Sequence, residues 1–429
     1  MTSPPKQECA FHEDEAFAKK LDADDALRGF RERFCIPTGS DGSPVVYFCG
    51  HSLGLLPKEA RRFVEEELED WARLGVDGHF KGRRPWYSYH EQFREPGARI
   101  VGARPGEVVM MNSLTVNLHL MMATFYRPTK ERYKILIESP TFPSDLYAVK
   151  TQLRHNGFDP ADALVTLQPR EGQHIVHAAD VESLLEDHGD SIALVLFSGV
   201  NFYTGQVLDM PRIAAAARRE GCVIGLDLAH AVGNVPLSLH DWDIDFAVWC
   251  NYKYLNAGPG AIGGCFVHER HGKNPDLPRL AGWWGNDPKT RFEMHRLDDF
   301  VPQDGADGWQ ISNPPILSAA PLLSSLAIFD EAGIDALRAK SKRLTAYLAY
   351  LLDRIEGRPF DIITPSDPAA RGCQLSILVR DDPRGLYKRL RGQNMVVDFR
   401  EPNIIRMAPV PLFNTFHEVW RCAQVLGNG

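Results

Sequence analysis

Residues 222–230 read CVIGLDLAH, an apolar run that ends in an acid and a histidine. Residues 246–253 read FAVWCNYK, a second apolar run that ends in a lysine. Apolar runs of this length are typical of strands buried in a parallel sheet. The carboxyl ends of such strands lie along the edge of the sheet where ligands bind. Asp227 and Lys253 are therefore expected to face one crevice.

Strands and helices alternate around these two runs. We expect further strands at 133–138 and 192–197, with helices at 57–74, 142–155 and 211–219. Residues 75–97, which are rich in glycine, arginine and aromatic residues, are interpreted as an ordered loop. This alternation predicts an α/β protein whose large domain has a mainly parallel sheet covered by helices.

The composition changes after the sequence Asn313-Pro314-Pro315. Helical stretches from about 318 to 355 and strand candidates at 375–379 and 395–399 predict a smaller α+β domain. We therefore expect three parts. They are an N-terminal segment, 1–60, that packs with the small domain; a large ligand-binding domain, 61–313; and a C-terminal small domain, 314–429.

Composition narrows the class of protein. The 429 residues and 48.1 kDa suggest two or three domains. A formal net charge of −8 disfavours a nucleic-acid-binding protein, which needs a concentrated basic surface. No run approaches the roughly 18 apolar residues of a membrane span, and residues 1–8 lack the apolar stretch of a secretion signal.

Cysteine and histidine usage fits a cytoplasmic protein without a metal site. The eight cysteines are scattered and form no C-x-x-C pair, as expected of reduced thiols. The histidine pairs 174/177 and 268/271 lack a third ligand, so they are interpreted as surface residues and no metal is expected.

Two motifs match well-known patterns but lack the context those patterns need. Residues 50–54, GHSLG, fit the nucleophile elbow of α/β-hydrolases, yet the preceding residues offer no sheet to hold an elbow. A backbone turn near a site is favoured there. Residues 258–263, GPGAIG, fit the dinucleotide-binding pattern, but residues 264–267 are expected to form a strand rather than a helix.

Asp227 and Lys253 together suit pyridoxal 5′-phosphate. This cofactor needs a lysine that binds it covalently and an acid that keeps its pyridine nitrogen protonated. Taken singly, a strand-end acid often caps a helix and a lysine is usually solvated. A phosphate site supports the pair, because residues 111–115, MNSLT, lead into the helical stretch 116–125, whose first amides attract an anion.

Longer strings resemble one family. Asp-x-x-His followed by a strand-end lysine resembles the fold type I pyridoxal-phosphate enzymes of aminotransferase class V, with a seven-stranded type of sheet, and several strings resemble the kynureninase family more closely. One departure is His51, where many members have asparagine. The strings run from about residue 47 to 415: 50–55 GHSLGL, 142–145 FPSD, 203–206 YTGQ, 227–234 DLAHAVGN, 252–258 YKYLNAG, 282–283 GW, 311–315 ISNPP and 406–411 RMAPVP.

The resemblance implies a role for each matching position. Lys253 would hold the cofactor covalently, Asp227 would bind its pyridine nitrogen, and Phe142 would stack on its ring. Tyr252 would contact the cofactor and relay a proton. The other residues implied to contact the cofactor are Leu114, Thr115, Asp145, Ser198, His230, Trp283 and Asn313. The residues implied to contact the substrate are Arg406, at the α-carboxylate, and Ser52, His79, Ser312 and Asn313.

The resemblance also implies a reaction and an assembly. The reaction is the hydrolytic cleavage of the Cβ–Cγ bond of L-kynurenine or 3-hydroxy-L-kynurenine to an anthranilate and L-alanine. It is a step of tryptophan degradation by the kynurenine pathway, which also serves NAD biosynthesis. The assembly is a cytoplasmic homodimer whose active sites are shared through Trp283 and Asn313. His79 and the pair Ser312–Asn313 resemble members that prefer the 3-hydroxylated substrate.

Two alternatives stay open. A class V cysteine desulfurase or selenocysteine lyase would need a mobile nucleophilic cysteine, and the candidate, Cys373, directly precedes a predicted strand and is interpreted as a small buried apolar residue. A protein of the same fold that binds a ligand without turnover is disfavoured, because Lys253, Asp227 and Arg406 occur together.

Overall fold

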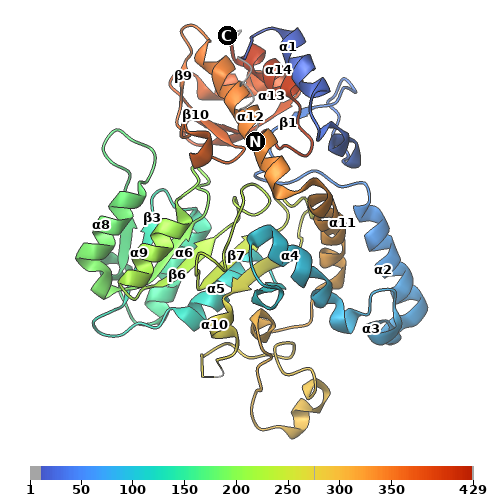
Figure 1. Ribbon diagram of the computed structural model, residues 1–429, viewed down its shortest axis with the longest axis vertical. Helices are drawn as coiled ribbons and strands as arrows, with labels where there is room; N and C mark the ends of the chain where they lie inside the picture. Colours follow the sequence, from blue (N-terminus) through green and yellow to red (C-terminus); the bar gives the residue numbers. More distant parts are fainter. Residues whose placement is uncertain (1–10, 275, 428–429) are drawn as a thin grey trace, which may run out of the picture.

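A seven-stranded sheet forms the centre of the computed structural model, which describes residues 11–274 and 276–427 (Figure 1). The strand order is β2-β8-β7-β6-β5-β3-β4, and β8 runs antiparallel to both of its neighbours while the other pairs are parallel. This confirms the predicted α/β class with a mainly parallel sheet. The strands are β2 (Val108–Met110), β3 (Lys134–Glu138), β4 (Leu164–Leu167), β5 (Ile192–Ser198), β6 (Val223–Asp227), β7 (Phe246–Cys250) and β8 (Gly263–Val267).

Helices bury both faces of this sheet. Leu194 and Val195, neighbours in β5, lie in separate apolar clusters on opposite faces. One cluster includes residues of α5 (Leu114–Phe125) and α6 (Pro143–His155); the other includes residues of α8 (Ala178–His188), α9 (Met210–Arg219) and α11 (Ile316–Ala332). Because neither face meets water, the strands appear in the sequence as continuous apolar runs.

A second, smaller sheet lies in the C-terminal part, at the top of Figure 1. It has the antiparallel order β12-β13-β10-β9, built from β9 (Phe360–Ile362), β10 (Leu375–Val379), β12 (Asp398–Arg400) and β13 (Ile404–Met407). Its apolar cluster includes residues of α12 (Ile334–Asp353), α13 (Pro383–Gly392) and α14 (Phe416–Gly427). The predicted smaller α+β part is therefore present.

The N-terminal segment packs against this C-terminal part. Helix α1 (Glu15–Ala23) buries Ala18 and Leu21 in the same apolar cluster, and it lies beside α14 at the top of Figure 1. Strand β1 (Val46–Tyr47) pairs in parallel with β11 (Met395–Val396). The boundaries 1–60, 61–313 and 314–429 stay a prediction.

Three local expectations were wrong. Helix α2 begins at Ala60 and ends at Leu74, so Pro57 precedes it. Residues 75–97 form short helical elements rather than a loop, held partly by a 2.9 Å hydrogen bond from Trp86 Nε1 to Glu67. The strand expected at 395–399 divides at Val397, because its first half pairs with β1 and its second half with β13.

The remaining elements are η1 (Arg28–Arg33), η2 (Gly75–Asp77), α3 (Gly78–Lys81), η3 (Trp86–Phe93), α4 (Arg94–Val101), η4 (Pro105–Glu107), α7 (Pro160–Ala163), η5 (Gly189–Ser191), α10 (Glu269–Gly272), η6 (Arg291–Arg296), η7 (Ala306–Trp309) and η8 (Pro368–Ala370).

Two further properties concern the described residues only. No single helix among them is long and apolar enough to cross a membrane; the pair α11 and α12, bent by 81°, meets the criteria of length and composition together. The seven cysteines in this part of the chain carry free thiols, and Cys9 lies outside it.

Candidate active site

A cavity of about 180 Å³ opens at the carboxyl ends of β5, β6 and β7. This is the edge of a parallel sheet at which ligands bind. Residues from the N-terminal segment, the central sheet and the C-terminal sheet meet there. The lining residues are His51, Ser52, Leu114, Thr115, Phe142, Ser144, Asp145, Ser198, Val200, Phe202, Asp227, Ala229, His230, Tyr252, Lys253, Arg400 and Arg406.

Lys253 follows β7 and points its amine at His230. Its Nζ lies 3.2 Å from His230 Nε2 and 5.9 Å from the centroid of the Phe142 ring. Burial, and then the positive charge of Lys253, holds the pKa of His230 well below its usual range, so this imidazole is neutral. Neutral His230 can accept a hydrogen bond from Lys253 Nζ at its Nε2, and its Nδ1 is buried without a hydrogen-bond partner.

Asp227 ends β6 beside two other buried carboxyls. Its Oδ1 accepts a 2.7 Å hydrogen bond from the Ala229 amide. Burial, and then the charge of Asp227, raises the pKa of Asp145 well above its usual range, while burial raises the pKa of Glu138 to about 7. Two carboxyls that line the cavity, those of Asp227 and Asp145, favour a bound cation there. A protonated pyridine nitrogen is such a group, so these residues fit the ring of pyridoxal phosphate.

The other end of the cavity fits a phosphate. Helix α5 begins at Leu114, and the side chain of its N-cap residue, Ser113, makes no capping hydrogen bond. The first amides of the helix and the positive end of its dipole are therefore available to an anion. Thr115 Oγ1 lies 3.1 Å from Ser144 Oγ, at the start of α6, so two hydroxyls lie beside these amides.

Arg406 reaches the cavity from β13. It is 1 % exposed, its Nε donates to Asp398 Oδ2 at 2.7 Å, and its Nη1 donates to the Phe202 carbonyl at 2.7 Å. Asp398 also accepts a 3.0 Å hydrogen bond from Arg400 Nε. These contacts fix the plane of the Arg406 guanidinium and leave other N–H groups for a carboxylate ligand.

The turn at 49–54 forms a wall of the cavity. The amides of Ser52 and Leu53 donate to the Cys49 carbonyl at 2.8 and 3.0 Å, and the Gly54 amide donates to the Tyr252 carbonyl at 2.8 Å. A side chain at Gly54 would collide with the backbone at Lys253 and Asn256. The motif GHSLG is thus a backbone turn near a site, as predicted, and its preceding strand β1 belongs to the C-terminal part.

The structure brings most of the candidate residues together, with four exceptions. Trp283 is 43 % exposed, and Ser312 and Asn313 are exposed on the surface. The His79 ring packs edge-on against Trp86, with centroids 5.4 Å apart. None of these four lines the cavity within one chain.

Sequence reasoning missed several lining residues, including His51 as a site residue, Phe202 and Arg400. Arg400 lies six positions before Arg406 on a neighbouring antiparallel strand, a spacing that carries meaning only once the strand pairing is known. Phe202 packs edge-on against Phe142, with ring centroids 5.3 Å apart. Glu138 was missed because a strand-end acid has no distinctive pattern.

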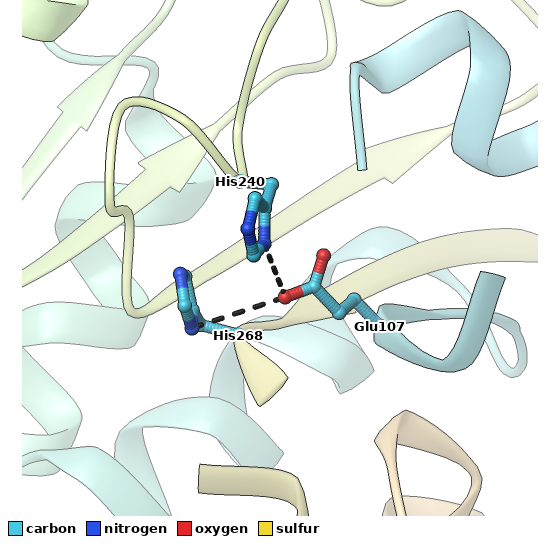
Figure 2. A group of neighbouring side chains, drawn as sticks. All are labelled: Glu107, His240 and His268. Atoms are coloured by element: carbon cyan, nitrogen blue, oxygen red, sulfur yellow. Dashed lines mark hydrogen bonds and ion pairs between the residues drawn. The ribbon is translucent and has the colours of Figure 1, made fainter. Parts of the chain in front are cut away.

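A second polar cluster, Glu107, His240 and His268, lies where β2 begins and β8 ends, at the edge of the sheet opposite the cavity. Figure 2 shows these three side chains. Glu107 Oε1 accepts from His240 Nδ1 at 2.9 Å and from the Glu269 amide at 2.8 Å, while its Oε2 accepts from the Arg104 amide at 2.8 Å. His268 Nδ1 accepts the Arg270 amide at 3.3 Å. His268 is buried, so its interpretation as a surface residue was wrong.

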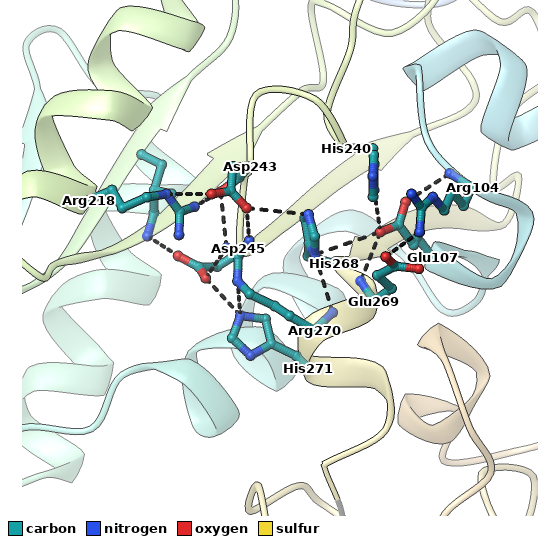
Figure 3. A network of polar contacts seen from close by, with 11 residues as sticks. Arg104, Glu107, Arg218, His240, Asp243, Asp245, His268, Glu269, Arg270 and His271 are labelled. Atoms are coloured by element: carbon teal, nitrogen blue, oxygen red, sulfur yellow. Dashed lines mark hydrogen bonds and ion pairs between the residues drawn. The ribbon is translucent and has the colours of Figure 1, made fainter.

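This cluster extends into a network that anchors the chain before β7 (Figure 3). Asp245 accepts the Ile224 amide at 2.8 Å and lies 2.7 Å from His271 Nε2. The network therefore ties β6, the start of β7 and α10 together. Because β7 leads directly to Lys253, these contacts help to fix the position of the site.

Cys373 does not have the surroundings of a nucleophile. It is fully buried before β10, its amide donates to Asn234 Oδ1 at 2.9 Å, and burial raises the pKa of its thiol to about 12. A reactive cysteine needs an accessible thiolate. Its interpretation as a small buried apolar residue is confirmed.

Comparisons with known proteins agree with this geometry. Residues 46–377 match the family described as aminotransferase class-V, and residues 337–426 match the family described as kynureninase C-terminal domain. The chain is 56 % identical to a kynureninase of Myxococcus xanthus and 54 % identical to one of Koribacter versatilis, and each match covers 97 % of both chains. It is 50 % identical to a kynureninase of Flavobacterium psychrophilum, over 96 % of this chain and 97 % of that one.

Solved structures with low sequence identity share the fold. A C-DES variant with glycine covalently linked to its pyridoxal-phosphate cofactor has a TM-score of 0.75 and 18 % identity, and the match covers 92 % of this chain and 98 % of that one. The cysteine desulfurase CsdA of Escherichia coli has a TM-score of 0.75 and 16 % identity, with 94 % and 98 % covered. At such identity the likeness concerns the fold alone.

Proposed function

The chain belongs to the kynureninase family, and from this premise we propose that its cavity hydrolyses the Cβ–Cγ bond of L-kynurenine or 3-hydroxy-L-kynurenine to an anthranilate and L-alanine. The chain is a pyridoxal-phosphate-dependent hydrolase acting on a carbon–carbon bond. The main support for placing the reaction in this cavity is that Lys253, Asp227 and Arg406 line it together.

Each of these three residues has a separate task in the proposal. When bound, pyridoxal phosphate supplies an electrophilic carbon and a ring that withdraws electrons. Lys253 holds the cofactor covalently and exchanges a proton with the substrate α-carbon at Nζ. Asp227 keeps the pyridine nitrogen protonated, and Arg406 binds the α-carboxylate through its planar guanidinium.

The neighbouring residues position these groups. Phe142 covers one face of the ring, Asp145 and Ser198 lie beside it, and the first amides of α5 with Thr115 bind the phosphate. Burial raises the pKa of the Tyr252 phenol, so Tyr252 stays protonated and can donate a proton as a general acid.

The test is the product analysis of the purified enzyme. Kynurenine should yield equimolar alanine and anthranilate, and cysteine is the control substrate for the desulfurase alternative. A higher kcat/KM for release of sulfide or persulfide from cysteine would contradict the proposal. The buried Cys373 favours the carbon–carbon reaction, because a desulfurase needs an accessible cysteine.

We also propose a homodimer whose active sites are shared. Leu68 and Trp71 on α2, with Leu56 before it and Leu317 on α11, are 42 %, 59 %, 50 % and 44 % exposed. A groove of about 430 Å³ between α2 and α11 includes three of them and also Pro259, close to Lys253 in the chain. An exposed apolar face of this kind is typical of an interface. A partner chain there could supply Trp283, Ser312, Asn313 and His79 to the neighbouring cavity.

Mixing two inactive variants tests the sharing. Lys253→Ala and Asn313→Ala remove groups that, in the proposal, come from different chains. Subunit exchange at equal concentrations should restore about a quarter of the wild-type activity, because half of the dimers are mixed and one of their two sites is intact. Trp71→Glu should shift the sedimentation coefficient to that of a monomer. A mixture no more active than the mean of the two variants would contradict shared sites.

For the substrate, we propose a preference for 3-hydroxykynurenine over kynurenine. Once a partner chain buries them, His79 and Asn313 can hydrogen-bond the ring hydroxyl, and a substrate without it would leave them unpaired at a cost of about 1–3 kcal/mol, or tenfold to a hundredfold in kcat/KM. The measurement is kcat/KM for both substrates on wild type and on the His79→Trp, Asn313→Thr double variant. A wild type that prefers kynurenine would show the proposal to be wrong.

A cytoplasmic location is also proposed. The free thiols at all seven described cysteines support it, because exposed and buried thiols persist in a reducing compartment. Fractionation of the source cells, with immunodetection of the protein, is the direct test.

A further inference from the structure

His51 is a buried polar residue for which the described protein offers no partner. Its side chain is 0 % exposed, and neither Nδ1 nor Nε2 has a hydrogen-bond partner. Buried polar groups are nearly always hydrogen-bonded, and leaving one unpaired costs free energy. Because His51 lines the cavity, a ligand in that cavity is the natural partner for its ring.

The backbone around His51 is closely packed, so the ring has little freedom to find another partner. A methyl group at Gly50 would lie 2.5 Å from Val410 Cγ2, and the hydrogen bonds to Cys49 close the turn on the other side. The His51 and His230 ring centroids are 6.3 Å apart. His51 therefore sits on the same side of the cavity as the amine that His230 contacts.

The charges around His51 are positive. Burial is the main reason that the pKa of His51 lies well below its usual range. The positive charges of Arg406, Lys253 and Arg400 lower it further. A neutral imidazole offers one N–H donor and one acceptor nitrogen. A donor surrounded by cations suits an anionic ligand, since the cations draw the anion into the pocket and the N–H can then bond it.

We propose that His51 donates a hydrogen bond to the α-carboxylate of the substrate, beside the guanidinium of Arg406. This inference rests on the proposed role of Arg406 as the carboxylate ligand. The α-amino and α-carboxylate groups of the substrate are bonded to the same carbon. His51 lines the same cavity as Lys253 and Arg406 and is affected by both of their charges, so it lies where it can reach the carboxylate. His51 is thus a specificity-determining residue for α-amino acids over simple amines.

The test compares two small ligands that differ only in the carboxylate. L-alanine and ethylamine both carry an amine, and their dissociation constants for the cofactor-loaded enzyme can be measured by calorimetry without turnover. In His51→Phe the binding of L-alanine should weaken about tenfold to a hundredfold, while ethylamine should change less than about twofold. His51→Asn keeps an N–H donor and should retain most of the preference for L-alanine.

Thermal unfolding separates this role from a structural one. The phenyl ring removes an unpaired buried polar group, so His51→Phe without amino-acid ligand should be at least as stable as wild type. A residue needed for folding would instead lower Tm when replaced. Should His51→Phe fail to fold, the smaller His51→Leu, which also lacks a donor, takes its place, and L-alanine binding that is unchanged in His51→Leu would overturn the proposal.

Arg406→Gln distinguishes failure of this inference from failure of the proposed function. Loss of the preference for L-alanine in Arg406→Gln but not in His51→Phe would overturn the role of His51 alone. An unchanged preference in Arg406→Gln would overturn the proposed carboxylate site itself. Equal weakening of L-alanine and ethylamine in His51→Phe would also overturn the inference, because it would indicate a general disturbance of the cavity.

Discussion

Substitution of Gly54 by alanine tests how closely the N-terminal turn must approach the lysine segment. A methyl carbon at Gly54 would lie 2.7 Å from Asn256 Cα and closer still to the Lys253 carbonyl. Ordinary contact begins at 3.4 Å. The turn and the lysine segment would therefore have to separate by about 1 Å, a displacement that can cost about a hundredfold in rate at a catalytic group.

The expected loss for Gly54→Ala is about a hundredfold in kcat/KM, which corresponds to about 2.7 kcal/mol of activation free energy. Overpacking should also lower the free energy of unfolding by about 1–3 kcal/mol. The assay is steady-state turnover of kynurenine at saturating cofactor, with urea unfolding followed by circular dichroism.

Gly29→Ala is the matched control, because a methyl group there meets no atom within 4 Å. This variant should keep wild-type turnover and stability. The reasoning is refuted if Gly54→Ala keeps kcat/KM within about threefold of Gly29→Ala, since the turn would then yield without moving the lysine.

Four further predictions concern single residues. Borohydride reduction of the holoenzyme should label Lys253, and Lys253→Ala should lose turnover; a label on another lysine, found by peptide mapping, would contradict the site. With cofactor at a hundredfold excess over its Kd, the free energy of unfolding should be about 2.7 kcal/mol higher than that of the cofactor-free protein. In Asp227→Ala most of this difference should be lost. Cys373→Ala should keep activity within about twofold, and a large loss would revive the desulfurase alternative. Burial lowers the pKa of His90 to about 3, so unfolding takes up a proton when the pH is below the usual pKa of 6.5. The contribution of His90 to stability is therefore full above pH 6.5 and falls as the pH drops. Between pH 7.5 and 5, the free energy of unfolding from urea titrations should fall by about 2 kcal/mol more in wild type than in His90→Gln.

The parts of the fold that could be predicted are those whose sequence pattern depends on burial alone. Strand β5 is apolar at nearly every position because both faces of the central sheet are covered. Asp227 and Lys253 could be placed because the ends of neighbouring parallel strands must meet at one edge. The same logic could not place the break at Val397, since the pattern of a strand does not say which sheet it joins.

The parts of the site that escaped prediction depend on contacts between distant segments. His51 lies in a turn whose surroundings are set by the C-terminal part, and Arg400 becomes a neighbour of Arg406 only through the pairing of β12 with β13. Glu138 is one acid at the end of one strand, a position that is common in α/β proteins. Trp283, Ser312, Asn313 and His79 lie outside the cavity of a single chain, so their roles rest on the proposed dimer.

The pairing of β1 with β11 has a consequence for the order in which the enzyme matures on the ribosome. The turn that carries His51 and Gly54 is anchored through β1, and the same segment is held at Asp41 by Asn394, a residue 353 positions further along the chain. At about 5–20 residues per second, roughly 20 to 70 seconds of translation separate the two. A nascent chain can complete its central sheet in that interval, yet the wall of its cavity forms only after residues 394–396 have been synthesised. Chains that stall or terminate before these residues should therefore be inactive, even where their central sheet has folded.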